Sequence, residues 1–307
     1  MILVGDRRTP DDWREDNVIF LSLDVQRASG IRLAVALPEN HYSRKNLGYL
    51  EAIRRGAGVI VESDDDNTPV NWRLGELSEQ VNGPCVSSPG WINIYRLFTD
   101  SHIWPRGFPL EELEPARTAQ IALVAGAWRS PVQQFLAGGD PDVDAVYRLT
   151  VGKTDHEFNA GVFVLGRDAI TPFNSQSTVW WPQAYPLMYL PSHVSFRMTD
   201  IWRSFVAQVC LWAMDMHLAY HSTAVHQQRN VHDLLRDFRD EIPGYTSNAA
   251  MVRELTALDL SPDASDISLN LRACYKRLVE VDVVPKEELR LVDLWVEDLE
   301  ALTLGSA

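Results

Sequence analysis

The sequence predicts an α/β protein in which a sheet is flanked by helices and followed by a helical C-terminal extension. Short apolar runs alternate with helical patterns along the first two-thirds of the chain, as in α/β folds. After about Pro243 the apolar residues recur only at helical spacing. We therefore expect a sheet-containing domain over residues 1–243 and a helical extension over residues 244–307.

The individual elements follow from the same patterns. Apolar runs predict strands at 1–5, 18–23, 59–61, 121–125, 145–149 and 161–165. Apolar residues three to four apart predict helices at 44–56, 131–137 and 199–217, the first ending at Gly56. In the second domain the predicted helices are 251–258, 267–281 and 286–304, with a polar break at 259–266.

The composition excludes several classes of protein. Hydrophobic residues make up 46% of the 307, too many for a disordered chain. The formal net charge of −14 disfavours nucleic acid as a partner. Three separated cysteines without a CxxC pair argue against a disulfide framework and a zinc ribbon. No apolar run approaches the roughly 18 residues of a membrane span, and the start lacks signal-peptide character, so we expect a cytoplasmic protein.

Three adjacent carboxylates, Asp64, Asp65 and Asp66, follow the strand predicted at 59–61. They repel one another, so they belong either to a solvated loop or to a site for a divalent cation. Mg²⁺ and Mn²⁺ prefer oxygen ligands and are usually held by one or two carboxylates plus substrate phosphates. Ligands of open α/β sheets bind at the carboxyl ends of strands, which is where this triplet lies.

Two basic residues, Arg44 and Lys45, begin the helix predicted at 44–56, next to Asn46. Positive charge at this end opposes the helix dipole, so the residues are either solvated or used to bind an anion. Neither a Walker A motif nor a GxGxxG motif is present, so the usual nucleotide fingerprints are absent.

Several segments, in this order, resemble the STELLO-type glycosyltransferases. They include Asp-Asp-Asp-Asn at 64–67, Pro-Arg-Gly-Phe-Pro at 105–109 and Asp-Ile-Trp-Arg at 200–203, together with residues 4–10, 42–53, 140–145 and 172–176. The resemblance runs from residue 1 to about 243. The chain is more distantly similar to the plant UDP-arabinopyranose mutases, also called reversibly glycosylated polypeptides. The plant STELLO proteins are Golgi membrane proteins, whereas we expect no membrane anchor here.

The resemblance implies a GT-A fold, with a Rossmann-like mixed sheet that binds a nucleotide sugar and a cation, Mn²⁺ or Mg²⁺. By position, Asp64 and Asp66 would be the ends of the Asp-x-Asp motif, with Asp66 on the metal and Asp64 nearer the ribose. The remaining nucleotide and diphosphate contacts would come from Gly5, Asp6, Thr9, Arg44, Lys45, Asn46 and Asp65.

A late histidine completes the metal shell in many GT-A enzymes, and His221 stands at the matching place. The alternative is a buried, hydrogen-bonded histidine, and His226 and His232 are rivals for the role. Asp200 would be a general base or bind acceptor hydroxyls, or else would only cap a helix. On the same acceptor side, Trp202 would stack on a sugar, Arg106 would bind phosphate or acceptor, and Arg203 completes the motif.

The sequence thus predicts a metal-dependent glycosyltransferase that moves a sugar from a nucleoside diphosphate, with UDP favoured, to a hydroxyl of a glycan or small molecule. One alternative is a nucleotide-sugar mutase that glycosylates itself on Arg106. Another is a non-catalytic partner of a glycosyltransferase complex, which the intact acidic triplet disfavours. The C-terminal helices could pack on the core or join two copies of the chain.

Overall fold

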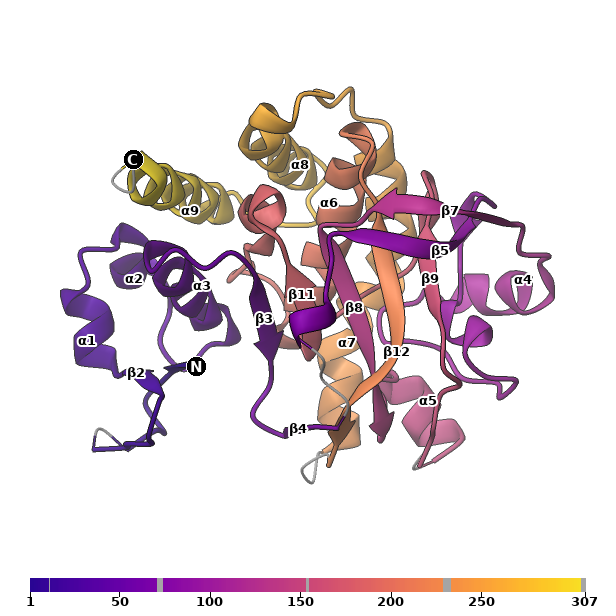
Figure 1. Cartoon of the computed structure of the whole chain (residues 1–307), viewed down its shortest axis with the longest axis horizontal. Helices are drawn as coiled ribbons and strands as arrows, with labels where there is room; N and C mark the ends of the chain where they lie inside the picture. The colour runs from indigo at the N-terminus through magenta and orange to yellow at the C-terminus, as the bar shows by residue number, and fades with distance from the viewer. Residues whose placement is uncertain (11, 71–73, 153–154, 229–232, 305–307) are drawn as a thin grey trace.

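The computed structural model describes residues 1–10, 12–70, 74–152, 155–228 and 233–304. At its centre is a mixed eight-stranded sheet in the order β3-β11-β8-β12-β9-β5-β7, with β4 paired to β12 (Figure 1). The strands are β3 Ile60–Ser63, β4 Asn67–Pro69, β5 Gln80–Val86, β7 Leu123–Arg129, β8 Val132–Gly139, β9 Val162–Leu165, β11 Ser177–Trp180 and β12 Leu218–Gln227. The sheet and its flanking helices confirm the predicted α/β class and are consistent with a GT-A-like fold.

The parallel strands β8 and β12 form the middle of this sheet. All of β8 except Phe135 is buried, so this strand has no polar face. The helix predicted at 131–137 is therefore wrong. The spacing of Val132, Phe135 and Leu136 suits a helix, but it also suits a strand that is covered on both sides.

Two other elements differ from the sequence prediction. Residues 145–149 belong to a helix, α5 Ala145–Thr150, because the Asp144 side chain accepts a hydrogen bond from the Tyr147 N–H and caps it. The strand predicted at 121–125 exists as β7, but it lies at the sheet edge and is almost entirely exposed. The apolar run at 145–149 was interpreted as a strand although it suits a helix equally well, and the run at 121–125 is apolar without being buried.

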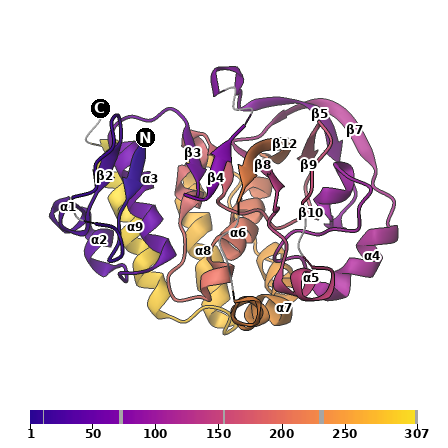
Figure 2. The same cartoon turned by 90° about the horizontal axis from the view of Figure 1, so that it is seen from below.

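Three helices, α6 Thr199–Ala213, α7 Leu234–Thr256 and α8 Ile267–Glu280, pack together on one face of the sheet (Figure 2). α6 is apolar around most of its circumference and is buried along nearly its whole length. α7 runs through Pro243, so the change of character that we placed there falls inside a helix. The predicted helix at 267–281 is confirmed by α8.

The N-terminal segment lies beside the main sheet and against the last helix, α9 Glu287–Leu304 (Figures 1 and 2). It contains the parallel strands β1 Ile2–Val4 and β2 Ile19–Leu21 and the helices α1 Leu23–Ala28, α2 Arg32–Ala36 and α3 Lys45–Arg54. Both α2 and α3 contact α9. The Asp298 carboxylate of α9 accepts hydrogen bonds from the N–H groups of Arg32 and Leu33, which fixes the segment to the C-terminal helices.

The remaining elements are the short pair β6 Gly90–Trp91 and β10 Ala169–Ile170, and helix α4 Leu113–Thr118. The three cysteines are buried and form no disulfide. Within the described residues, no helix has both the length and the apolar character needed to cross a membrane.

Candidate functional site

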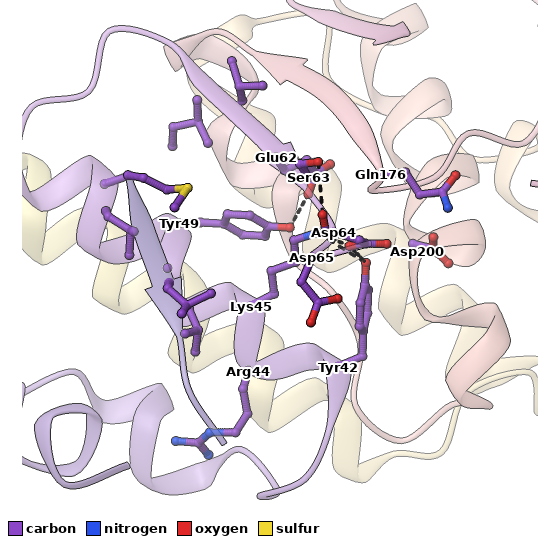
Figure 3. Close-up of a pocket in the computed structure, with 18 of the residues that line it drawn as sticks. Tyr42, Arg44, Lys45, Tyr49, Glu62, Ser63, Asp64, Asp65, Gln176 and Asp200 are labelled. Carbon is purple, nitrogen blue, oxygen red and sulfur yellow. Dashed lines mark hydrogen bonds and ion pairs between the residues drawn. The ribbon is translucent and has the colours of Figure 1, made fainter. Parts of the chain in front are cut away.

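A cavity of about 890 Å³ lies between the N-terminal segment and the main sheet. One wall is β1 and α3, and the other is β3 with the acidic triplet (Figure 3). Arg106, Asp142 and Asp200 also line the cavity. Among the described strands, β1 pairs with β2 and β3 pairs with β11, so the cavity occupies the space between two strand edges. Its volume lies within the ordinary range for ligand pockets.

The sequence places small and acidic groups where the two strands end. Gly5 follows β1, where a Cβ would come within 2.6 Å of the Phe20 ring on β2, so only glycine fits there without a shift. Asp64 follows β3, and the chain between the two strands contains α3. The cavity therefore opens beside the carboxyl ends of β1 and β3, which belong to two different sheets. Strand ends of this kind are the usual ligand position in α/β proteins.

Lys45 and Tyr42 converge on Asp64 (Figure 3). The Lys45 ammonium and the Tyr42 hydroxyl each donate to Asp64 Oδ1 at 2.7 Å, and Lys45 also donates to the Ser175 carbonyl at 2.9 Å. Burial raises the pKa of Asp64, and the ammonium of Lys45 opposes that shift. The ammonium of Lys45 thus compensates the negative charge of Asp64 within the protein.

Within the described residues, Asp65 and Asp66 have no such cation. Asp65 is exposed and lines the cavity without a hydrogen bond or ion pair to any described side chain. Among the side chains that the structure describes, the Asp66 carboxylate accepts only from two neutral amides, Asn67 Nδ2 at 3.3 Å and Gln227 Nε2 at 3.2 Å. Two uncompensated carboxylates therefore face the cavity side by side.

A buried ion pair supports the strand that leads to this triplet. Arg203 of α6 donates to both oxygens of Glu62 on β3, at 2.7 and 3.0 Å. Tyr49 and Trp180 also donate to the same carboxylate. Burial would lower the pKa of Arg203, but the negative charge of Glu62 holds it above its ordinary value.

A second buried ion cluster also lines the cavity. The Arg106 guanidinium donates to Asp142 at 2.9 Å, to both Asp200 oxygens at 2.9 and 3.1 Å, and to the Arg197 carbonyl. Burial would lower the pKa of Arg106, but the two carboxylates raise it well above its ordinary value. Arg106 also holds the pKa of Asp142 below its usual range despite burial.

The cavity brings together most of the residues that the sequence predicted. It is lined by Gly5, Asp6, Arg44, Lys45, Asp64, Asp65, Asp66, Arg106 and Asp200. The side chains of two of these residues already form hydrogen bonds to other groups of the protein. The Asp6 carboxylate accepts from the N–H groups of Asn40 and His41. The Arg44 guanidinium points away from the triplet (Figure 3) and is bound by Gln26 and the Leu37 carbonyl.

The free N–H groups expected at the start of the helix at 44–56 are also absent. A 3₁₀ turn, Tyr42–Arg44, runs directly into α3. The N–H of Arg44 donates to the His41 carbonyl, and the N–H of Lys45 donates within the same turn. The expected contribution of Arg44 and of this helix end to a diphosphate site is therefore not present, whereas the Lys45 ammonium does reach the cavity.

Four other predicted residues do not line the cavity, because their polar atoms are used inside the fold. Thr9 accepts from the Asp6 N–H, and the Asn46 side chain bonds both backbone groups of Leu190. Trp202 donates to Asn248 on α7 and is buried, so it presents no face for stacking a sugar. Arg203 is held by Glu62, as described above.

His221 does not line the cavity either. Its ring stacks on Phe135 with the centroids 4.4 Å apart, and its Nε2 lies 2.9 Å from Gln133 Oε1. Burial lowers its pKa to about 4. This is the hydrogen-bonded alternative, with the ring half-buried, and the metal role expected for His221 has no geometric support. Of the rivals, His226 faces Gly139 rather than the cavity, and His232 lies outside the described residues.

The cavity also contains side chains that we did not single out. They include Tyr42, Tyr49, Glu62, Asp142, Gln176, Arg197 and Gln227. Tyr42, Asp142 and Gln176 lie in segments that resemble the family, so those segments contained the signal. No family-like segment contains Gln227, because its position in the cavity depends on the pairing of β12 with β4.

The donor set fits a hard divalent cation only in part. Among the described residues, no group of three His, Cys, Asp or Glu side chains is arranged to hold a metal. Asp65 and Asp66 nevertheless offer carboxylate oxygens without a cationic partner, as Mg²⁺ and Mn²⁺ require. Such a cation would take its remaining ligands from phosphates, water or neutral oxygens.

Comparisons with known proteins agree with the motifs. Residues 197–306 match the family model described as STELLO glycosyltransferases. The match includes α6 to α9, so the C-terminal helices form part of what the family model describes.

Two proteins of Arabidopsis thaliana, STELLO2 and STELLO1, both named as probable glycosyltransferases, are 29% and 28% identical to this chain. The alignments cover 75% and 74% of the chain but 33% and 32% of the relatives, so the chain spans about a third of their length. The resemblance of the motifs is confirmed, and the chain is similar to the STELLO glycosyltransferases over these residues.

Proposed function

We propose that this chain is a glycosyltransferase that binds a nucleoside-diphosphate sugar, with UDP as the favoured nucleotide, together with Mn²⁺ or Mg²⁺. The observation that carries the proposal is the cavity between β1 and β3, with two uncompensated carboxylates at its strand ends. The names of the relatives support the same activity.

The shape and polarity of the cavity suit such a donor. Apolar side chains of β1 and β3, such as Ile2, Val4 and Ile60, line one part, and the carboxylates line another. A flat base can lie against the apolar part while the diphosphate reaches the acidic part. The order of groups along a nucleotide sugar then directs the sugar toward Arg106 and Asp200.

Electrostatics supports the requirement for a metal. Each cation lining the described part of the cavity already has protein partners: Arg44 with Gln26, Lys45 with Asp64, Arg55 with Glu51, Arg106 with Asp142 and Asp200, and Arg197 with Glu241. A diphosphate entering beside Asp65 and Asp66 would meet net negative charge. A divalent cation between the diphosphate and these carboxylates would replace the repulsion with attraction. The cation would also act as a Lewis acid on the leaving diphosphate.

Asp200 is better suited to position Arg106 than to take a proton. Each of its oxygens accepts from Arg106, and Oδ1 also accepts from the Ile201 N–H. Proton abstraction by Asp200 would require this buried pair to separate. We therefore propose that the Arg106–Asp200 pair forms a fixed polar surface for the sugar or the acceptor.

The same cluster disfavours the mutase alternative. Self-glycosylation needs a guanidinium nitrogen that can attack the sugar, and Arg106 is only 5% exposed. Its nitrogens donate to Asp142, Asp200 and Arg197, and its raised pKa keeps it protonated, without a lone pair for attack. No observation on the described residues favours a mutase over a transferase.

The proposal is tested by incubating the purified chain with a panel of nucleotide sugars and Mn²⁺ and measuring release of the nucleoside diphosphate. We expect release from one nucleotide sugar, dependent on the metal and reduced at least about a hundredfold by Asp66→Asn. The matched control is Asp215→Asn, an exposed carboxylate that does not line the cavity, which should leave the rate unchanged. Release that persists in Asp66→Asn, or that is equal with and without metal, would contradict the proposal.

A further inference from the structure

We propose that the divalent cation is held by Asp66 together with the side-chain amide oxygens of Asn67 and Gln227, which take the place expected for a histidine. The proposal rests on the proposed function, because the diphosphate of the donor would supply further ligands. It assigns a role to a glutamine on β12 that no sequence motif indicated.

The geometry centres on the Asp66 carboxylate. Asn67 and Gln227 are direct partners in the antiparallel pairing of β4 with β12. Asn67 Nδ2 lies 3.3 Å from Asp66 Oδ1, and Gln227 Nε2 lies 3.2 Å from Asp66 Oδ2. Each carboxylate oxygen therefore has one amide beside it, and Asp66 and Gln227 both line the cavity.

The two amides leave their oxygens without partners. Asn67 Oδ1 and Gln227 Oε1 are both buried, and neither accepts a hydrogen bond within the described residues. Gln227 is only 7% exposed to solvent. Buried polar oxygens are almost always satisfied, so two unsatisfied ones next to a single carboxylate need an explanation.

A cation explains them. A half-turn of each terminal amide exchanges its nitrogen and oxygen, which then places an amide oxygen about as far from the carboxylate oxygen as the nitrogen is now. In an octahedral shell with metal–oxygen bonds of about 2.1 Å, neighbouring ligands lie about 3 Å apart. The separations of 3.2 and 3.3 Å, one to each oxygen of Asp66, are close to that spacing, so a cation that contacts both amide oxygens would be bound by both oxygens of the carboxylate. Without the cation, each amide turns its nitrogen to Asp66 instead.

The neighbouring residues do not compete for the role. Asp64 Oδ1 is taken by Lys45 and Tyr42. Successive side chains of a strand point to opposite faces, so Gln227 faces the cavity while His226 lies over Gly139. His221 is stacked on Phe135 and does not line the cavity.

The test is a titration of the full chain with Mn²⁺, in which free Mn²⁺ is followed by electron paramagnetic resonance with and without UDP. Gln227→Leu should weaken Mn²⁺ binding at least about tenfold, because the remaining ligands lose one oxygen. Gln227→Glu keeps an oxygen and should bind as tightly as the wild type or more tightly. His221→Phe, which preserves the stacking, should change the affinity less than about twofold.

Folding of the variants is checked by thermal unfolding in EDTA. If Gln227→Leu unfolds early, the shorter Gln227→Asn takes its place, because it keeps a polar amide but withdraws the oxygen by one methylene and should again weaken Mn²⁺ binding. Wild-type affinity in Gln227→Leu, or loss of Mn²⁺ in His221→Phe, would overturn the assignment. Mn²⁺ binding that depends on Gln227 but is unaffected by UDP would support the cation site and contradict the nucleotide proposal. Mn²⁺ binding that depends on UDP but is unchanged in the Gln227 variants would support the nucleotide proposal and contradict the assignment of Gln227 as a ligand.

Discussion

Glu62 and Arg203 form an ion pair that is buried almost completely beneath the acidic triplet. Two further donors, Tyr49 and Trp180, satisfy the same carboxylate. A buried pair of this kind is strongly destabilising to break, because the remaining charge is left without a partner. The pair therefore fixes the end of β3 from which Asp64 to Asp66 project.

Glu62→Gln should lower the free energy of unfolding by about 3–5 kcal/mol, because Arg203 is left as an uncompensated buried charge. Urea unfolding followed by tryptophan fluorescence measures the change. The control is Glu114→Gln, whose exposed pair with Arg117 should contribute nothing measurable. Equal midpoints for both variants would show that the buried pair does not support the fold as described.

His221 predicts a particular pH dependence of stability. Burial lowers its pKa to about 4 in the folded chain, against an ordinary value of 6.5. The unfolded chain therefore binds more protons between these values, and stability should fall as the pH drops through this window, by about 1.4 kcal/mol per pH unit.

His221→Phe should remove that part of the slope, measured as free energy of unfolding at pH 7, 6, 5 and 4.5. The stacking partner Phe135 stays in place in the variant. An unchanged slope in His221→Phe would mean that the ring is not buried in its neutral form.

At the scale of elements, α9 supports one wall of the candidate site. Its Asp298 carboxylate accepts from the N–H groups that begin α2, and α2 and α3 both contact α9. Helix starts leave such N–H groups unsatisfied unless a side chain caps them. Here the cap comes from more than 260 residues away in the sequence, with separations of 265 and 266 residues.

Asp298→Ala should therefore lower stability by about 1–2 kcal/mol and speed amide hydrogen exchange in α2 and α3, because the cap and the tether to α9 are lost together. Asp293→Ala on the same helix removes only a half-exposed pair with Arg272 and serves as the control. Faster exchange spread evenly over the whole chain would contradict a local tether.

The elements also show what the sequence can and cannot predict. The strands at the N-terminus, α3, α6, α8 and α9 were predictable because their apolar spacing and stop signals are local. β8 was not, because burial on both faces removes the alternation that identifies a strand. α5 was missed because its short apolar run was interpreted as a strand and the helix cap at Asp144 was not recognised.

Some residues of the candidate site could likewise be predicted from the sequence, whereas others could not. Gly5, Lys45 and the acidic triplet follow strand ends or belong to family-like motifs, so their place was predictable. Trp202, Arg203 and Asn46 belong to the same motifs but serve the interior, since a motif does not say which way a side chain points. Gln227 enters the site through strand pairing, which local sequence does not reveal.

At the scale of the whole molecule, the site joins the first residues of the chain to residues that come much later in the sequence. The N-terminal segment supplies β1 and α3, and the main sheet supplies β3, β12 and the Arg106 cluster. The C-terminal helices hold the N-terminal segment through α9 and the buried site floor through α6. The boundary at residue 243 therefore stays a prediction about sequence character, while the packing links both sides of it.

The central claim is that the cavity binds a nucleoside diphosphate together with a divalent cation. The most direct measurement is the thermal stability of the wild type and of Asp66→Ala with UDP, GDP, CMP or ADP, each with and without Mn²⁺. A ligand of the native state at a hundredfold excess over its Kd should add about 2.7 kcal/mol. We predict such a shift for one nucleoside diphosphate, UDP above the others, only with Mn²⁺ and absent in Asp66→Ala. No shift with any nucleotide, or a shift that Asp66→Ala retains, would contradict the account.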